Sequence, residues 1–142
     1  MDATAPQNAD DQAAKQVVLR LFNECMNGRR PELVPELFAP DFVNHEVGIH
    51  GAAQLEPWLR NYLTIFPDLK VEVLGMTAEA GRVWSWVKVS GTHSGPWHGV
   101  DATGKKVSWH AVAIDTVRDG RIAERHAVID LRPPLREIGG TL

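Results

Sequence analysis

The sequence predicts an α+β domain in which three helices come first and an antiparallel sheet follows. In the first half of the chain apolar residues recur at helical spacing, whereas in the second half they alternate as they do along strands. Asp119-Gly120 joins two strand-like runs, and this dipeptide favours the tight turn of a β-hairpin. Helices followed by antiparallel strands are typical of helices packed on one face of a curved sheet. We expect such a sheet to leave a cavity at its open end.

The helices are predicted from apolar spacing and from stop signals. A first helix covers residues 11–27 and ends at Gly28, which is a good C-terminal signal. A short second helix covers residues 31–38 and begins with proline in its first turn. A third helix, residues 52–66, carries a broad apolar stripe and ends before Pro67-Asp68. Between the second and third helices, residues 38–45 read as a turn into a short extended piece.

Strands account for most of the second half. Alternation predicts strands at residues 70–76 and 82–93, followed by a loop that contains glycine and proline. The hairpin strands then cover residues 107–117 and 121–129. Residues 135–138 allow one more helical turn near the end of the sequence.

Composition indicates one globular domain, residues 11–142, behind a flexible lead-in of residues 1–10. The 142 residues are 44% hydrophobic and 23% charged, and the net charge of -3 gives no electrostatic case for binding nucleic acid or an anionic membrane. Cys25 is the only cysteine, so no internal disulfide can form and the cytoplasm is the expected location. No apolar run approaches the roughly 18–20 residues that a membrane span needs.

The first hairpin strand has two unlike faces. Side chains alternate along a strand, so Ala111, Ala113 and Asp115 share one face with Trp109, while the opposite face is mostly bulky. Small residues along one face either admit a closely packed element or leave room for a ligand.

Five motifs carry a family resemblance. They are Phe38-Ala-Pro-Asp-Phe-Val-Asn-His45, Gly91-Thr-His-Ser-Gly95, Gly99 through Thr103-Gly104, Asp119-Gly-Arg-Ile122 and Asp130-Leu131. Their order and spacing resemble the SnoaL-like polyketide cyclases, also called ester cyclases, of the NTF2-like superfamily, over residues 16–139. The resemblance implies a cone-shaped α+β barrel, a homodimer packed through the outer sheet face, and no cofactor or metal. Well-known members close aromatic rings by intramolecular aldol condensation, with a buried Asp as general acid and base.

The resemblance also assigns positions in the site. Asn44 matches the pocket asparagine of the family. The family's Gln and His on the first hairpin strand fall on Ala111 and Ala113, and its catalytic Asp falls on Ala127. If the alignment with the family is shifted by one residue on the second strand, His126 takes the position of the catalytic Asp instead. With alanines there, no base stands near the substrate proton that an aldol reaction must remove.

Three polar residues remain as candidate catalytic groups: Asn44, Asp115 and Asp130. Asp115 has the parity to enter the cavity, where burial would raise its pKa, or it lies solvated near the strand end. Asp130 either acts as a base at the cavity mouth or caps the tail that follows. We expect the substrate-binding residues to be Ala111, Ala113, Ala127, Trp58, Tyr62, Trp109 and His126.

Two further residue classes bear on ligands and partners. The six histidines show no zinc-like spacing and no supporting cysteine, so we expect no metal site. Trp84 and Trp86 share one strand face. If that face points outward, the apolar patch favours a dimer interface.

The leading hypothesis is a cofactor-independent cyclase that closes a ring on a largely apolar polyketide intermediate in natural-product biosynthesis. The missing acid and base groups favour a pericyclic or dehydrative route. The first alternative is a conventional aldol cyclase that uses Asp130 or His126. A second is an epoxide hydrolase or hydroxylase, although the epoxide hydrolases that the sequence resembles use an Asp–Arg–Asp set and we expect no inward-facing Arg here. A third is a small-molecule-binding protein without catalysis.

Overall fold

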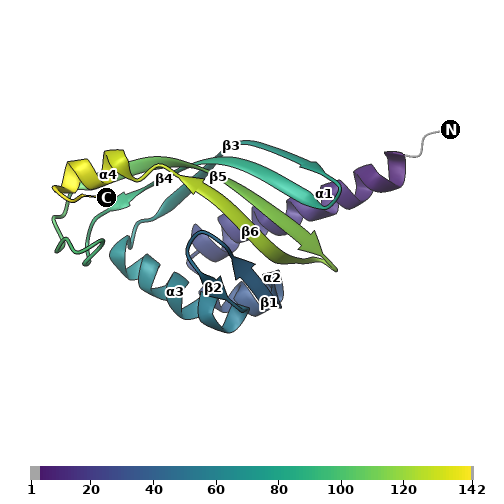
Figure 1. Ribbon diagram of the computed structural model, residues 1–142, viewed down its shortest axis with the longest axis horizontal. Coiled ribbons are helices and arrows are strands. Elements are labelled where there is room, and N and C mark those ends of the chain that lie inside the picture. Colours follow the sequence, from purple (N-terminus) through teal and green to yellow (C-terminus); the bar gives the residue numbers. More distant parts are fainter. Residues whose placement is uncertain (1–3, 142) are drawn as a thin grey trace.

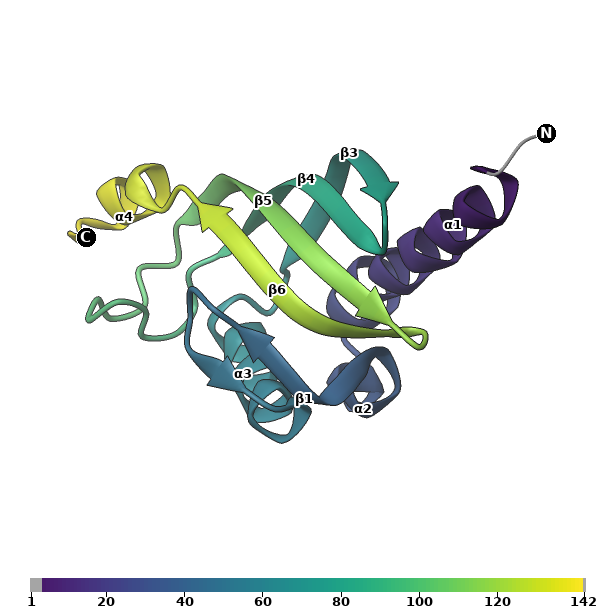
Figure 2. The same ribbon diagram turned by 45° about the vertical axis from the view of Figure 1, so that its right-hand side comes forward.

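The computed structural model describes residues 4–141, and within them one curved, unclosed sheet of six strands packs against helices (Figures 1 and 2). The strand order is β2-β1-β6-β5-β4-β3. Helices α1 and α3 lie on the same side of the long strands, and the short helix α4 lies at the opposite end of the molecule from the start of α1 (Figure 1). The predicted α+β class is confirmed.

The helices follow the apolar periodicity of the first half of the chain. The bounds are α1, Thr4–Arg20; a π-helical turn, Leu21–Met26; a 3-10 turn, Pro31–Leu33; α2, Val34–Leu37; α3, Ala52–Ile65; and α4, Arg132–Ile138. The predicted first helix therefore starts earlier and changes its winding in the last turn. Residues 4–10 of the expected flexible lead-in are helical, residues 1–3 lie outside the described residues, and flexibility there stays a prediction.

The strands comprise a long meander and two short additions. Their bounds are β1, Phe38–Asn44; β2, Ile49–His50; β3, Lys70–Glu79; β4, Arg82–Thr92; β5, Lys106–Arg118; and β6, Arg121–Ile129. The β3–β6 meander is antiparallel throughout, whereas β1 pairs with β6 in parallel. The extended piece expected at residues 38–45 is thus a strand of the same sheet, because the meander brings β6 back beside it.

The hairpin between β5 and β6 is confirmed. Asp119 and Gly120 both have positive φ, 51° and 75°, as a two-residue type I′ turn requires. Ala113 of β5 pairs directly with Ala127 of β6, so the small residues face one another across the two strands. The hairpin register therefore sets one stretch of the inner wall.

An aromatic cluster packs where the end of α3, the loop after β4 and the start of β5 meet. Phe66 is fully buried, and its ring centroid lies 5.0 Å from that of Trp97 and 5.4 Å from that of Trp109. Gly91 stays in register with Val107, and a Cβ atom at Gly91 would lie 3.0 Å from Cβ of Phe66. Glycine here leaves room for the Phe66 ring rather than producing a bulge.

Candidate functional site

A cavity of about 490 Å³ lies between the inner face of the sheet and helix α3. Its volume is typical of a small-molecule site. Exposed lining residues, Val47, Trp58 and Ile129, mark its opening, whereas Leu21 and Phe22 are buried at the closed end. Most of its lining is apolar: Leu21, Phe22, Met26, Phe38, Phe42, Val47, Leu55, Trp58, Leu59, Tyr62, Ile65, Val71, Val87, Val89, Pro96, Trp97, Trp109, Ala111, Ala113, Ala127, Ile129 and Leu131.

The hairpin gives the cavity its width. Ala111 and Ala113 on β5 and Ala127 on β6 all line it, together with Trp109. These three alanines occupy the positions that the family resemblance assigns to Gln, His and Asp. Their methyl groups give this stretch of the wall space and apolar contact.

Two aromatic residues of α3 form the opposite wall. The rings of Trp58 and Tyr62 stack with their centroids 5.1 Å apart, and both side chains line the cavity. Burial raises the pKa of Tyr62 well above its usual range, so its hydroxyl stays protonated near neutral pH. Tyr62 can donate a hydrogen bond there, but it cannot serve as a base.

Asn44 supplies a polar group at the end of β1. The residue is 7% exposed and lines the cavity, and its Oδ1 atom is buried without a hydrogen-bond partner among the described residues. A buried carbonyl oxygen that lacks a partner costs free energy unless a ligand or water satisfies it. The Asn44 oxygen is therefore available to a hydrogen-bond donor of a bound molecule, while a carbonyl oxygen of that molecule would have to accept from the amide nitrogen of Asn44.

An ion pair stands beside Asn44, because Asn44 pairs with Arg125 across the β1–β6 ladder. Arg125 lines the cavity and donates from Nε to Asp115 Oδ1 at 2.6 Å and from Nη2 to Asp115 Oδ2 at 2.9 Å. The Asp115 side chain is completely buried, and that of Arg125 is 16% exposed. Arg125 also lies over the ring of Phe22, with Cζ 5.9 Å from the ring centroid.

This arrangement corrects the expectation that no Arg faces inward. Arg125 has the same strand parity as Ala127, so a cavity-facing Ala127 already implies a cavity-facing Arg125. It also corrects both readings of Asp115, which is neither solvated nor part of the cavity lining. Asp115 holds Arg125 in position, and Nη1 of Arg125 makes no hydrogen bond within the described part of the chain.

Two of the predicted site residues lie away from the cavity lining. Arg132 Nε donates a hydrogen bond to Asp130 Oδ1 at 2.9 Å. This guanidinium holds the pKa of the Asp130 carboxyl below its usual range. His126 points to the outer face of β6, where its Nδ1 atom lies 3.0 Å from Glu46 Oε1. The structure thus gathers Asn44, the three alanines, Trp58, Tyr62 and Trp109 around one cavity, without Asp130 and His126.

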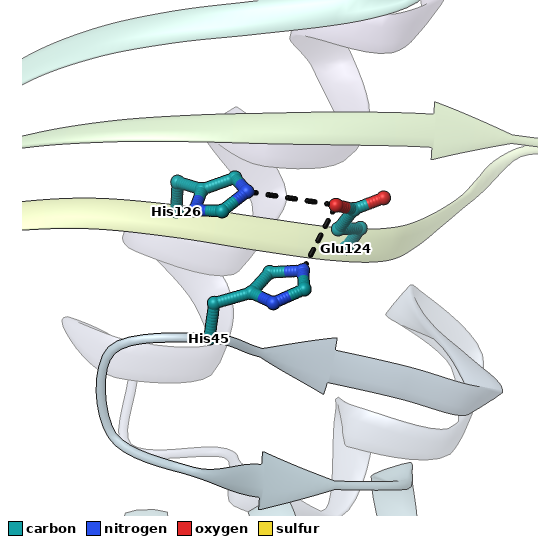
Figure 3. A group of neighbouring side chains, drawn as sticks. All are labelled: His45, Glu124 and His126. Atoms are coloured by element: carbon teal, nitrogen blue, oxygen red, sulfur yellow. Dashed lines mark hydrogen bonds and ion pairs between the residues drawn. The ribbon is translucent and has the colours of Figure 1, made fainter.

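A group with metal-ligand chemistry lies on that outer face. His45, Glu124 and His126 have nitrogen and oxygen atoms that all lie within 4.8 Å of one another (Figure 3). The spacing of the histidines in the sequence did not reveal this group, because His45 and Glu124 lie 79 residues apart.

The site's chemistry follows from its groups. The cavity presents mostly apolar surface, and its polar lining residues are Asn44, Asn61, Tyr62, His98 and Arg125. Arg125, Asn44 and Tyr62 can donate hydrogen bonds there. Such donors stabilise negative charge that develops on an oxygen atom.

Within the described residues, no helix is long and apolar enough to cross a membrane.

Comparison with known proteins identifies the family. The proposed hydroxylase AclR from Streptomyces galilaeus is 31% identical, with a TM-score of 0.78 over 89% of this chain and 95% of that one. IdmH, a proposed polyketide cyclase from Streptomyces antibioticus, is 25% identical, with a TM-score of 0.75 over 89% and 98%. A proposed SnoaL-like polyketide cyclase from Jannaschia sp. CCS1, 24% identical, has the same fold, with a TM-score of 0.84 over 100% and 99%.

A comparison with curated protein sequences finds no match. The family model of the SnoaL-like polyketide cyclases matches residues 16–138, which confirms the resemblance of the sequence motifs. Because this match spans most of the chain, the protein belongs to the SnoaL-like polyketide cyclase family.

Proposed function

We propose that the protein is a cofactor-independent cyclase that closes a ring on a largely apolar polyketide intermediate. One observation carries the proposal: the cavity combines apolar walls with the donors Arg125 and Asn44, and alanines line it at the positions that the family resemblance assigns to acid and base groups. A flexible apolar chain that folds against Trp58 and the alanines would bring its reacting carbons together. Positioning of this kind lowers the barrier of an intramolecular reaction.

Arg125 and Asn44 have a role that follows from their chemistry. A carbonyl oxygen of the substrate would accept hydrogen bonds from Arg125 Nη1 and from the Asn44 amide nitrogen. These donors polarise the carbonyl and stabilise charge that builds up on its oxygen in the transition state. Asp115 acts as a positioning residue, because it holds the guanidinium through two hydrogen bonds.

The available groups favour a pericyclic closure over a dehydrative one. In a pericyclic closure π electrons of the substrate become the new σ bonds, and no proton enters or leaves. A dehydrative closure needs a base for one proton and an acid for the departing hydroxyl. The Arg125 guanidinium and the Asn44 amide have no basic lone pair, and both oxygens of Asp115 accept hydrogen bonds from Arg125. His98 also lines the cavity, but it is an exposed residue of the loop after β4, so His98→Ala should leave the rate of a pericyclic closure unchanged.

The test uses linear polyene intermediates that carry a carbonyl group, with cyclised product followed by chromatography and mass spectrometry. We expect Asn44→Ala to lower kcat by about 10²-fold, as removal of an oxyanion donor does. Asn23→Ala, at an exposed asparagine of the π-helical turn outside the cavity lining, is the matched control and should keep the wild-type rate. If Asn44→Ala also keeps that rate, the assignment of Asn44 fails.

A pH profile separates this route from a conventional aldol reaction. Without an acid or base in the mechanism, kcat should be flat between about pH 6 and 9. A bell-shaped profile that disappears in Asp130→Asn or in His126→Ala would support the aldol alternative instead. Ligand binding without turnover of any intermediate would support a non-catalytic binding protein.

Arg125 bears on the epoxide hydrolase alternative, because this alternative requires an arginine in the cavity and Arg125 lines the cavity. Hydrolysis needs in addition a carboxylate that activates water in the cavity. Asp115 is fully buried and bonded twice to Arg125, so it does not meet this need. Incubation with apolar epoxides gives a direct check, and diol formation lost in Arg125→Lys would favour hydrolysis over cyclisation.

We further propose that the chain works as a homodimer through the outer face of the sheet, in the cytoplasm. Trp84 and Trp86 on β4 are 46% and 52% exposed, which is unusual for neighbouring tryptophans on a monomer surface. Light scattering should give the mass of a dimer, and Trp84→Ser/Trp86→Ser should give a monomer that retains its circular dichroism.

The cytoplasmic location is supported by the single cysteine. Burial raises the pKa of the Cys25 thiol to about 11, which suits an unreactive cysteine in a reducing compartment.

A further inference from the structure

The outer surface behind the cavity wall carries a second group of polar side chains. In the β1–β6 ladder Asn44 pairs with Arg125, and both residues line the cavity. Strand alternation therefore sends the neighbours Glu124 and His126 to the outer face. There they meet His45, which follows the end of β1 (Figure 3).

We propose that His45, Glu124 and His126 bind a divalent metal ion of the zinc class. Two imidazoles and one carboxylate form a ligand set that zinc and similar transition metals accept, with water in the remaining position. The site is independent of the proposed cyclase reaction, because it lies on the opposite side of β6 from the cavity.

The distances suit such an ion. Nε2 of His45 lies 2.9 Å from Oε1 of Glu124, and Nε2 of His126 lies 3.6 Å from the same oxygen. Ligand atoms about 2.0–2.1 Å from a tetrahedral zinc ion stand about 3.3 Å from one another. These two separations lie on either side of that value, and all three ligand atoms lie within 4.8 Å of one another, so rotations of the exposed side chains would form the site.

Glu46 holds His126 in the orientation that a metal needs. Oε1 of Glu46 lies 3.0 Å from Nδ1 of His126, and its Oε2 accepts the backbone N–H of Ala127 at 2.9 Å. A carboxylate bonded to Nδ1 favours the tautomer with a proton there and a lone pair on Nε2. Metal-binding histidines are commonly supported by a carboxylate in this way.

Both imidazole rings also direct a nitrogen toward Glu124 (Figure 3). Nε2 of His126 lies 3.6 Å from a carboxylate oxygen of Glu124. The imidazole planes of His45 and His126 are parallel within 6°, with centroids 4.2 Å apart. A divalent ion between these three groups would accept a lone pair from each of them.

The side chains are open to solvent and come from distant parts of the sequence. Those of His45 and Glu124 are each 41% exposed, so an ion can enter without local unfolding. A bound ion would link the end of β1 to β6. It would therefore stabilise the wall that carries Asn44 and Arg125 on its inner side.

The experiment titrates the full-length, untagged chain, stripped of metal, with zinc chloride in a calorimeter. We expect one ion per chain with a Kd of about 10 µM or lower, and a higher Tm in the presence of zinc. Cobalt(II) in place of zinc should give the absorption bands of a four-coordinate site. His126→Ala and His45→Ala should each weaken binding at least about 10-fold, and Glu46→Gln should weaken it by a similar factor.

His110→Ala is the matched control, because His110 is an exposed histidine on the neighbouring strand β5 and should leave zinc binding unchanged. Circular dichroism of each variant checks that it folds. Absence of binding at millimolar zinc would overturn the proposal and identify the group as ion pairs only. Equal losses in His110→Ala and His126→Ala would overturn it as well, because they would indicate non-specific surface binding. Either result leaves the cyclase assay unaffected.

Discussion

The inner and outer faces of β6 each carry a charged side chain with a close partner, but the surroundings of the two pairs are opposite. On the inner face Arg125 binds Asp115, whose side chain is completely buried. On the outer face Glu124 meets His45 at 2.9 Å, with both side chains 41% exposed. Water screens the outer pair and replaces either partner at little cost, whereas the inner pair has no solvent to replace a lost partner. Neighbouring residues on one strand therefore have very different effects on stability.

The largest expected effect follows from breaking the inner pair. Arg125→Met would leave the Asp115 carboxylate buried without its counter-ion, and we expect a loss of about 3–5 kcal/mol in the free energy of unfolding. Urea unfolding followed by circular dichroism measures this loss. The double variant Asp115→Asn/Arg125→Met removes both charges and should be more stable than Arg125→Met alone. A single variant that loses less than about 1 kcal/mol would contradict this account of the inner face.

A smaller effect should come from filling the cavity on the inner face. Ala127→Leu puts a larger side chain into the lining, and we expect an apolar fluorescent probe to bind about 10-fold more weakly, or about 1.4 kcal/mol. Val128→Leu is the matched control, because Val128 is the adjacent residue and lies 73% exposed on the outer face. Equal affinity of the two variants for the probe would mean that it binds outside the cavity.

A pH experiment extends the comparison to an exposed carboxylate held by hydrogen bonds. The Thr92 hydroxyl and backbone N–H, each 2.7 Å from an Asp68 oxygen, hold the pKa of Asp68 below its usual range. A lowered folded-state pKa stabilises the fold above the unfolded-state pKa, near 3.9, and this contribution disappears as pH falls through the folded value. Asp68→Asn should cost less than about 1 kcal/mol at pH 7 and progressively less in acid. If the difference in the free energy of unfolding between Asp68→Asn and wild type stays constant with pH, this linkage is refuted.

The smallest effect is expected for the outer pair. In metal-free buffer, Glu124→Gln should change the free energy of unfolding by less than about 0.5 kcal/mol, because exposed ion pairs contribute little. The same urea unfolding experiment measures it. A loss comparable to that of Arg125→Met would mean that the two faces do not differ as described.

Local patterns predicted most of the fold. The helical spacing before Pro67, the alternation after it and the turn at Asp119-Gly120 depend on residues close together in sequence, so they identified the helices and the β3–β6 meander. The parallel pairing of β1 with β6 was not predicted, because no local pattern reports contacts across most of the chain. The π-helical turn after α1 likewise has no sequence signal that we recognise.

The candidate site was predicted in part. Strand parity singled out Ala111 and Ala113, and the family motif singled out Asn44; all three line the cavity. Arg125 was missed although its parity with Ala127 points inward, because an arginine on a strand is ordinarily assumed to face solvent. The group of His45, Glu124 and His126 depends on the β1–β6 pairing and could not be predicted before that pairing was known.

The parallel pairing of β1 with β6 also bears on how the chain folds. Its contacts join residues about 80 positions apart, so forming them early would carry the entropic cost of closing a long loop. We therefore expect the local β4–β5–β6 hairpins to form early and β1 to dock late. The order can be checked by pulse-labelling of backbone amides during refolding, with protection of β1 expected last. On this order the cavity becomes complete only in the final step, so a partly folded chain would have no enclosed site for its ligand.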